Sequence, residues 1–265
     1  MRIARLQLPA GSTTYARYHD DGTFTVLEGN PFDVMSDSGV RVEGKLLSPV
    51  DPRAILCVGL NYRKHAEETN APLPPNPVLF MKSPGAVQNP EDPILLPRTL
   101  RSDSVDYECE LAVVIGKAAR NVKRADATQY ILGYTCANDV SARDWQKEGG
   151  GGQWCRGKTF DTFCPLGPVI VTPDELPNPN ALRIATRING ETLQDWNTND
   201  MIFDIPTLIE FLSASTTLLP GTVIITGTPH GVGMARDPKR WLKPGDVVEI
   251  EIEGIGILRN PVLEE

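Results

Sequence analysis

Two glutamates stand one residue apart within the run Tyr107-Glu-Cys-Glu-Leu-Ala-Val-Val-Ile115. The β-branched residues of this run predict a strand, and side chains on a strand alternate between its two faces. Glu108 and Glu110 are therefore expected on one face, with Cys109 on the other. Adjacent carboxylates repel each other, so one interpretation is a divalent cation held between them. The alternative is a solvated edge strand with glutamates on its outer face, and the pattern alone favours this alternative.

A third carboxylate, Asp139, follows the apolar segment Gly133-Tyr-Thr-Cys-Ala-Asn138. It would complete a three-carboxylate set, although a turn after a strand is also a routine position for aspartate. The chain contains only three histidines, His19, His65 and His230. A metal site must therefore rely on carboxylates, which favours a hard, oxygen-binding ion over zinc.

A candidate proton-transfer pair lies in the segment Val58-Gly-Leu-Asn-Tyr-Arg-Lys-His-Ala-Glu-Glu68, where a strand ends at glycine and a short helix is expected. His65 and Glu68 stand three residues apart, so they would share one helical face. A histidine oriented by a carboxylate can take a proton from water. The segment is also compatible with an ordinary charged surface helix, and its pattern alone favours that interpretation.

Two glycine-rich segments complete the candidate site. Gly149 to Gly152 are four consecutive glycines, which predict either a mobile flap or a floppy loop, and Lys158 follows them. Thr226-Gly-Thr-Pro-His-Gly-Val-Gly233 follows an apolar strand, and its glycines allow the backbone to approach an anion. The segment lacks the Gly-x-x-x-x-Gly-Lys pattern of a phosphate-binding loop.

The remaining pattern predicts a β-rich α+β protein with two parts. Residues 1–50 are expected to form a small N-terminal β unit, with a hairpin turn at Asp20-Asp-Gly22, and residues 51–265 the main domain that carries the candidate site. Helices are expected at 204–212 and at 125–132. Strands are expected at 54–58, 78–81, 107–115, 182–188, 222–226 and 247–252.

The composition limits which binding partners and which cellular location we expect for the protein. The formal net charge of −8 and the absence of any basic run argue against nucleic acid. No apolar run reaches the length of about 20 residues that spans a bilayer, and no leader pattern precedes the first strand. The five cysteines form no Cys-x-x-Cys pair. We therefore expect a cytoplasmic protein with reduced thiols and no membrane partner.

Taken together and in this order, the motifs resemble the fumarylacetoacetate hydrolase family. They are Gly59-Leu-Asn-Tyr-x-x-His-x-x-Glu68, Tyr107-Glu-x-Glu-Leu111, Asn138-Asp-Val-Ser-Ala-Arg-Asp144, Lys158-x-Phe-Asp-x-Phe-x-Pro-x-Gly-Pro168, Asn197-Thr-x-Asp-Met-Ile-Phe203 and Thr226-Gly-Thr-Pro-x-Gly-Val-Gly233. The resemblance covers about residues 53–262, and residues 1–50 resemble the variable N-terminal extension of bacterial members. It implies a mixed β-sandwich roll, commonly assembled as a homodimer.

The resemblance also implies roles for individual residues. Glu108, Glu110 and Asp139 match the ligands of Mg²⁺ or Mn²⁺; His65 and Glu68 match the catalytic dyad; Lys158 matches the active-site lysine; and Lys82, Arg143 and Thr228 lie in stretches that match the substrate pocket. His230 stands where the family varies, so it is assigned no role.

The expected activity is metal-dependent hydrolysis of a C–C bond in a small 2,4-dioxo acid of the acylpyruvate or fumarylpyruvate type, through a stabilised enolate. The same machinery would serve an isomerase or tautomerase of 2-hydroxydiene dioates, or an oxaloacetate-type decarboxylase. A non-catalytic metal-binding relative is a more distant alternative, and the pairing of His65 with Glu68 argues against it. The motifs do not choose among the three reactions.

Overall fold

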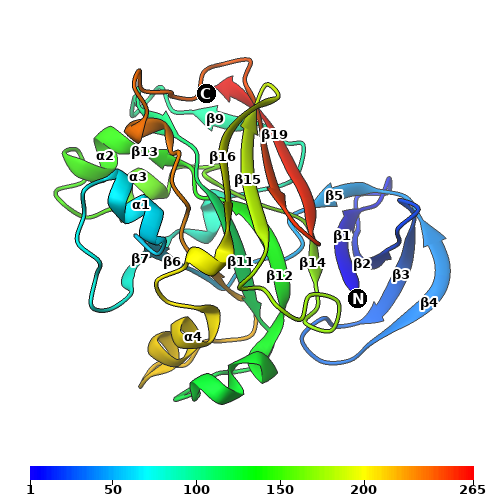
Figure 1. Cartoon of the computed structure of the whole chain (residues 1–265). Coiled ribbons are helices and arrows are strands. Elements are labelled where there is room, and N and C mark those ends of the chain that lie inside the picture. Colours follow the sequence, from blue (N-terminus) through cyan, green and yellow to red (C-terminus); the bar gives the residue numbers. More distant parts are fainter.

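Two packed β-sheets and a projecting N-terminal lobe make up the computed structural model, which describes all residues 1–265 (Figure 1). The larger sheet has twelve strands. Its main path runs in the order β4 (Met35–Val42), β3 (Phe24–Gly29), β2 (Thr13–Tyr18), β1 (Arg2–Gln7), β14 (Cys164–Val171), β12 (Ile131–Asn138), β11 (Cys109–Ile115), β17 (Thr222–Ile225), β6 (Ala54–Gly59) and β7 (Val78–Lys82). The short strands β5 (Lys45–Leu47) and β8 (Val87–Gln88) pair with β1 and β14.

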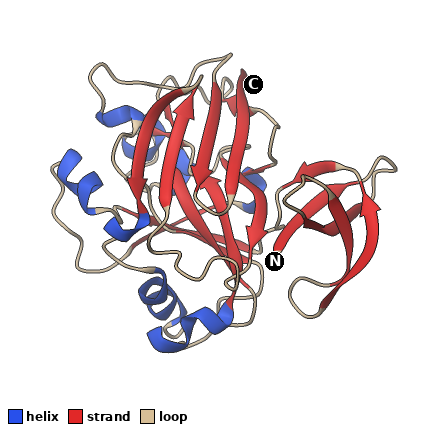
Figure 2. Ribbon diagram, turned by 45° about the vertical axis from the view of Figure 1, so that its right-hand side comes forward, coloured by secondary structure: helices blue, strands red, loops and turns tan.

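A second sheet of five strands packs against the first. Its order is β16 (Glu191–Asn197), β15 (Arg183–Ile188), β18 (Val247–Ile252), β19 (Gly256–Glu264) and β9 (Ile94–Leu96), while β10 (Val105–Asp106) pairs with β13 (Ser141–Ala142). The α-helices are α1 (Arg63–Glu68), α2 (Arg143–Lys147), α3 (Cys155–Lys158) and α4 (Ile205–Ser213), and 3₁₀ turns occur at Pro84–Ala86, Arg124–Tyr130, Thr198–Asp200 and Gly233–Ala235. Helices α1, α2 and α3 gather on the side of the sheets away from the N-terminal lobe (Figures 1 and 2).

Strand β11 lies at the centre of the larger sheet and is buried on both faces. Leu111 and Val113 point into the core shared with the second sheet, where Ile184 and Ile250 meet them. Val114 points to the opposite face and joins a separate apolar cluster. A strand covered on both faces reads as a continuous apolar run, which is why 111–115 shows no polar alternation.

The N-terminal strands form the projecting lobe, as expected from the β pattern of residues 1–50 (Figure 2). β2 and β3 form the expected hairpin around Asp20-Asp-Gly22. However, β1 also pairs with β14, with Ile3 opposite Ile170. The larger sheet therefore continues past the expected domain boundary near residue 50, and the division into domains 1–50 and 51–265 stays a prediction.

Two predicted elements differ in the structure. Residues 124–130 form a 3₁₀ helix rather than an α-helix, because Ala127 is their only buried residue and a longer helix would have no apolar face to bury. Ile131 then begins β12. The strand expected from Tyr107 begins at Cys109, because the Glu108 N–H donates to the Asn138 side chain instead of a neighbouring strand.

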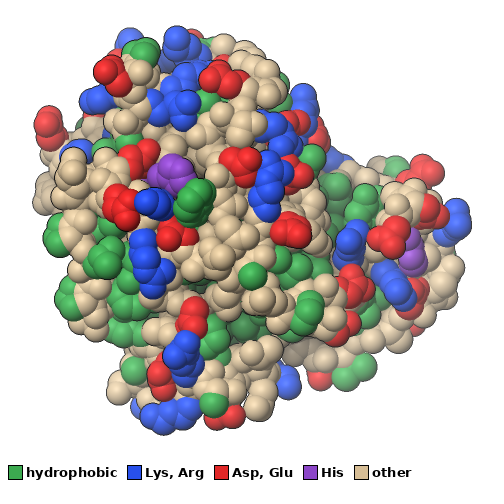
Figure 3. All heavy atoms as spheres, in the orientation of Figure 1, with side chains coloured by type: hydrophobic (Ala, Val, Ile, Leu, Met, Phe, Trp, Pro, Cys, Tyr) green, Lys and Arg blue, Asp and Glu red, His purple; other side chains and the backbone are tan.

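The other expected strands and the helix at α4 are confirmed. None of the helices combines the length and apolarity that a bilayer crossing requires. On the face shown in Figure 3, acidic and basic side chains are interspersed, without a large basic patch. The absence of a nucleic-acid partner stays a prediction.

Candidate active site

The three predicted metal ligands come together at one end of the β11–β12 pair. These strands run antiparallel with Cys109 opposite Asn138, so the start of one strand lies beside the end of the other. Glu108 and Glu110 flank that first residue, and Asp139 directly follows the last. One carboxylate oxygen from each of the three lies within 4.8 Å of the others.

All three carboxylates are buried, which excludes the solvated edge strand. Glu108 is 5% exposed, Glu110 2% and Asp139 0%. Strand β11 is central rather than at an edge, with β12 on one side and β17 on the other. Buried carboxylates require compensation by cations or hydrogen bonds, so the positive charges around them decide what the site can hold.

Lys158 supplies the nearest positive charge. Its Nζ donates to Glu108 Oε2 at 2.6 Å and to Asp139 Oδ2 at 2.7 Å. Burial alone would lower the pKa of Lys158, but Asp139 and Glu108 outweigh burial and raise the pKa above its ordinary value. The protonated form of Lys158 is therefore favoured among these carboxylates, and it donates to both of them.

Arg143 joins this cluster to a further buried carboxylate. Its Nη2 donates to Glu108 Oε1 at 2.7 Å, its Nε to Asp106 Oδ2 at 2.8 Å, and its Nη1 to Gln146 Oε1 at 2.9 Å. Burial alone would raise the pKa of Glu108, but Arg143 and Lys158 hold it well below its usual range. Arg143 lines the pocket as predicted, yet most of its donors are committed to protein acceptors.

Glu110 has no such cation. The backbone N–H of Gly227 donates to its Oε2, but no lysine or arginine contacts it. Burial, with repulsion from Asp139 and Glu108, raises the pKa of Glu110 well above its ordinary value. The cluster therefore has more negative charge than the protein itself compensates.

Lys82 does not lie in the pocket, so the prediction that it contacts substrate does not fit its position. It is 2% exposed, and its Nζ donates to the backbone carbonyls of Val140, Lys158 and Phe163. The same Nζ lies 2.7 Å from Asp139 Oδ1, close enough for charge attraction. Because its three protons go to the carbonyls, Lys82 compensates the charge of Asp139 without donating a hydrogen bond to Oδ1.

These features fit a hard divalent ion. The donor set consists of carboxylate oxygens, as Mg²⁺ and Mn²⁺ prefer. Glu110 lacks a compensating cation, and Asp139 Oδ1 lacks a hydrogen-bond donor. An ion ligated by Glu108, Glu110 and Asp139 would satisfy both needs.

The dyad is formed as predicted and faces the same pocket. His65 Nδ1 lies 3.0 Å from Glu68 Oε2, and Glu68 Oε1 accepts from the Gly231 N–H at 2.8 Å. Helix α1 is also tied down at its start, where Arg63 Nη1 donates to the Met201 carbonyl at 2.7 Å. His65 lines the pocket, and its Nε2 has no hydrogen-bond partner in the protein.

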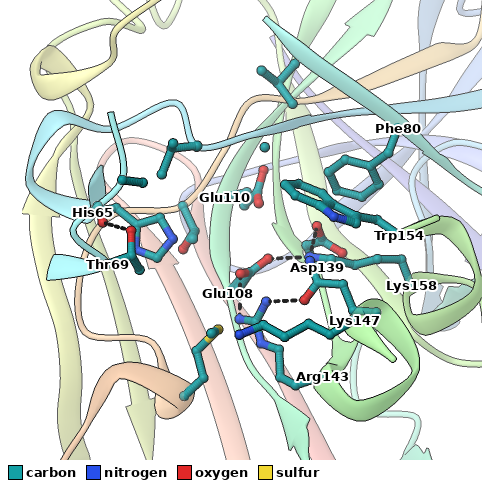
Figure 4. A pocket seen from close by; sticks show the side chains of 17 residues that line it. His65, Thr69, Phe80, Glu108, Glu110, Asp139, Arg143, Lys147, Trp154 and Lys158 are labelled. Atoms are coloured by element: carbon teal, nitrogen blue, oxygen red, sulfur yellow. Dashed lines mark hydrogen bonds and ion pairs between the residues drawn. The ribbon is translucent and has the colours of Figure 1, made fainter. Parts of the chain in front are cut away.

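The pocket is small, with a volume of about 240 Å³. Phe80 and Trp154 form an aromatic wall beside Lys158, with their ring centroids 5.5 Å apart (Figure 4). Gly59 allows Trp154 to approach, because a Cβ there would lie 2.4 Å from the indole ring. Such a volume suits a substrate of a few heavy atoms rather than a polymer.

Thr228 lines the pocket as predicted, and sequence reasoning missed the residue that holds it. Gln194 is 1% exposed; its Nε2 donates to Thr228 Oγ1 at 2.9 Å and to the Pro229 carbonyl at 2.9 Å. Its Oε1 accepts from the Cys109 N–H at 3.0 Å. No motif contains Gln194, so no sequence signal pointed to it.

Asp106 and Trp154 were also missed. Asp106 directly precedes the Tyr107-Glu-x-Glu run and accepts from the N–H groups of Gly233 and Met234 as well as from Arg143. The position of Asp106 next to this run is the sequence signal that could have identified it as a site residue. Trp154 lies two residues after the four glycines. An aromatic residue beside a glycine-rich segment is the sequence signal that could have identified it as part of the pocket.

The fold and the carboxylate site define an enzyme of the fumarylacetoacetate hydrolase family, and comparison with known proteins agrees. The family described as "Fumarylacetoacetate (FAA) hydrolase C-terminal" matches residues 54–263. The chain therefore belongs to this family, as the motifs predicted. The match leaves out the whole of the N-terminal lobe, residues 1–50.

Named relatives carry related activities. A mitochondrial oxaloacetate tautomerase (fahd2) of Xenopus laevis is 49% identical over 219 residues, which cover 82% of this chain and 68% of the relative. The human mitochondrial oxaloacetate tautomerase FAHD2A is 48% identical over 224 residues, covering 84% and 71%. These relatives are mitochondrial, so the expected cytoplasmic location stays a prediction.

Solved structures agree over the whole chain. A 5-carboxymethyl-2-hydroxymuconate delta-isomerase from Mycobacterium smegmatis has 40% sequence identity and a TM-score of 0.88, with 100% of both chains covered. A fumarylacetoacetate hydrolase from Exiguobacterium antarcticum has 35% identity and a TM-score of 0.90, also with 100% of both chains covered. The mixed, strand-rich fold implied by the motifs is therefore confirmed.

Proposed function

We propose that this enzyme is a tautomerase or isomerase that moves a proton within a small 2-oxo dicarboxylic acid, such as oxaloacetate, through its enol form. One observation carries the proposal. A histidine with an unpartnered Nε2, His65, and a buried lysine that donates to two carboxylates, Lys158, line the same small pocket. Enolisation needs this combination of a base for the C–H proton and a positive charge for the oxygen.

In this mechanism His65 Nε2 takes a proton from the carbon next to the keto group. Glu68 accepts from Nδ1, which fixes the ring orientation and stabilises the imidazolium that forms. Negative charge then develops on the keto oxygen, and Lys158 balances it. His65 returns the proton to oxygen or to another carbon, which completes the tautomerisation or isomerisation.

A divalent ion held by Glu108, Glu110 and Asp139 would supply Lewis-acid charge for binding the 2-oxo carboxylate end of the substrate. We propose Mg²⁺ or Mn²⁺, because the donors are hard oxygens. We also propose that the protein forms a homodimer, as the resemblance to the family implies.

This proposal differs from the main expectation from sequence, which was hydrolysis of an acylpyruvate. Most of the named relatives are tautomerases or isomerases, and they favour the alternative activity. Hydrolysis stays the second candidate, because His65 held by Glu68 is equally suited to activating water. Decarboxylation of oxaloacetate is the third, and it requires no attacking water.

A substrate panel tests the proposal. The protein loaded with Mg²⁺ or Mn²⁺ is mixed with enol-oxaloacetate, acylpyruvates and 2-hydroxydiene dioates, and each reaction is followed by ultraviolet absorbance and by proton NMR. We expect accelerated enol–keto conversion without loss of carbon. Rapid acylpyruvate cleavage, with enol–keto conversion at the rate of buffer, would put the hydrolase first. Full activity in protein shown to be metal-free would overturn the role of the ion.

A further inference from the structure

Lys147 is the one lysine or arginine of the pocket whose charge no protein carboxylate uses. Arg143 is committed to Asp106 and Glu108, and Lys158 is committed to Glu108 and Asp139. The Lys147 side chain lines the same pocket but forms no ion pair and no hydrogen bond with the protein. Its ammonium is therefore free to bind an anionic group of a ligand.

Helix α2 places Lys147 at the mouth of the pocket. It is the last residue of the helix and stands four residues after Arg143, so the two side chains leave the same helical face. Arg143 is buried, whereas Lys147 is exposed to solvent. In Figure 4 the Lys147 side chain extends alongside Arg143 at the pocket.

The charge balance of the pocket indicates which anionic group this is. In the cluster around the metal ligands, the buried carboxylates are Asp106, Glu108, Glu110 and Asp139, and the buried cations are Lys82, Arg143 and Lys158. With all four carboxylates ionised, the divalent ion of the proposed function leaves this cluster with one net positive charge. That charge balances one carboxylate of the substrate and leaves a second carboxylate uncompensated.

Few parts of the pocket surface can bind a second carboxylate of the substrate. Phe80, Trp154 and Val58 form apolar surface, where an unpaired charge is unfavourable. The oxygens of the metal-ligand cluster would repel it. Lys147 is the remaining positively charged side chain that lines the cavity and has no ion pair.

We infer that Lys147 binds the distal carboxylate of the substrate and thereby sets the preference of the enzyme for dicarboxylates over monocarboxylates. This inference rests on the proposed function for the identity of the inner 2-oxo carboxylate end. A charge-assisted hydrogen bond of this kind corresponds to roughly 10- to 100-fold in affinity. Because Lys147 does not touch the reacting carbon, it contributes to binding more than to the rate of the chemical step.

A matched pair of ligands tests this role without turnover by tautomerisation. Dimethyloxaloacetate is trimethylpyruvate with one methyl group replaced by a carboxylate. In both ligands the carbon next to the keto group carries no hydrogen, so neither ligand can form an enol. Their dissociation constants for the Mn²⁺-loaded full chain are measured by calorimetry. For Lys147→Met we expect roughly 10- to 100-fold weaker binding of dimethyloxaloacetate, with trimethylpyruvate unchanged.

Two further variants serve as controls. Lys147→Arg keeps the charge and should retain most of the preference. Lys117→Met removes the charge of an exposed lysine outside the pocket and should change neither constant. With oxaloacetate as substrate, Lys147→Met should raise KM by a similar factor and leave kcat within about threefold.

The outcomes separate this inference from the proposed function. Equal weakening of both ligands, or no weakening of either, in Lys147→Met would overturn the role of Lys147. If wild-type protein prefers the dicarboxylate and Lys147→Met removes the preference, the inference stands even where enol–keto conversion is not accelerated. In that case the proposed function alone would be wrong.

Discussion

Glu68 holds His65 with one carboxylate oxygen and the loop after β17 with the other. Oε2 lies 3.0 Å from His65 Nδ1, while Oε1 accepts from the Gly231 N–H at 2.8 Å. The orientation of the imidazole is thus coupled to the loop that also carries Thr228. This relationship makes Glu68 a positioning residue for the base rather than a second base.

The first prediction concerns this pair. His65→Ala should lower kcat by roughly 10²–10⁴-fold, because the group that moves the proton is lost. Glu68→Gln should lower kcat by roughly 10–100-fold, because the amide orients the ring but does not stabilise its charged form. Steady-state kinetics would measure both, and the Mn²⁺ dissociation constant should stay at its wild-type value. Near-normal turnover of the best substrate by both variants would exclude proton transfer by this pair.

The second prediction concerns ion binding by Glu110. Glu110→Gln should weaken Mn²⁺ binding at least roughly tenfold, because one of three charged ligands is lost. The amide oxygen can still accept from the Gly227 N–H, so the fold should be retained. Calorimetric titration with Mn²⁺ checks the affinity and circular dichroism checks the fold. Wild-type affinity in this variant would mean that Glu110 is not a ligand.

The third prediction follows from the raised pKa of Glu110, which burial and the neighbouring carboxylates cause. A carboxyl group with a raised pKa in the folded state stabilises the protein fully below its unfolded pKa, and this contribution is lost as pH rises through the folded pKa. The metal-free wild type should therefore lose stability relative to metal-free Glu110→Gln as pH rises. Thermal unfolding of both proteins across a pH series measures the difference. A pH-independent difference would contradict the prediction.

The fourth prediction concerns the segment 149–157. Gly151 and Gly152 have positive φ angles of 61° and 83°, and a Cβ at either position would meet no atom within 4 Å. Little packing therefore holds Gly151 and Gly152, whereas Trp154 packs against Phe80 in the pocket wall. We expect fast amide hydrogen exchange in the free enzyme and clear slowing when a substrate analogue binds. Equal protection with and without ligand would argue against closure.

The fifth prediction tests the start of α4, away from the pocket. Asp204 is the N-cap, and its Oδ1 accepts from the Thr207 N–H at 3.0 Å. Asp204→Ala should reduce the free energy of unfolding by about 0.5–2 kcal/mol, because a first-turn N–H loses its acceptor. Urea denaturation measures the change, and kcat should stay at its wild-type value. A large loss of activity in folded protein would instead connect α4 with the site.

The sequence by itself determined the local parts of the site. The two-residue period of a strand was enough to place Glu108 and Glu110 together, and the helical spacing of three was enough to pair His65 with Glu68. The hairpin at Asp20-Asp-Gly22 was also predictable, because glycine readily takes the positive φ angle of 81° that Gly22 has in this turn. These features depend on neighbours within a few residues, so local rules apply.

Only the tertiary structure decided how the charges are distributed. Lys82 pairs with Asp139 and Arg143 joins Asp106 to Glu108, whereas Lys147 is the lysine of the pocket whose ammonium has no protein partner. The ion pairs that fix these roles join residues dozens of positions apart, and their geometry depends on the β11–β12 register. Sequence spacing cannot reveal which cation reaches which carboxylate, because the three-dimensional path of the chain sets both distance and burial.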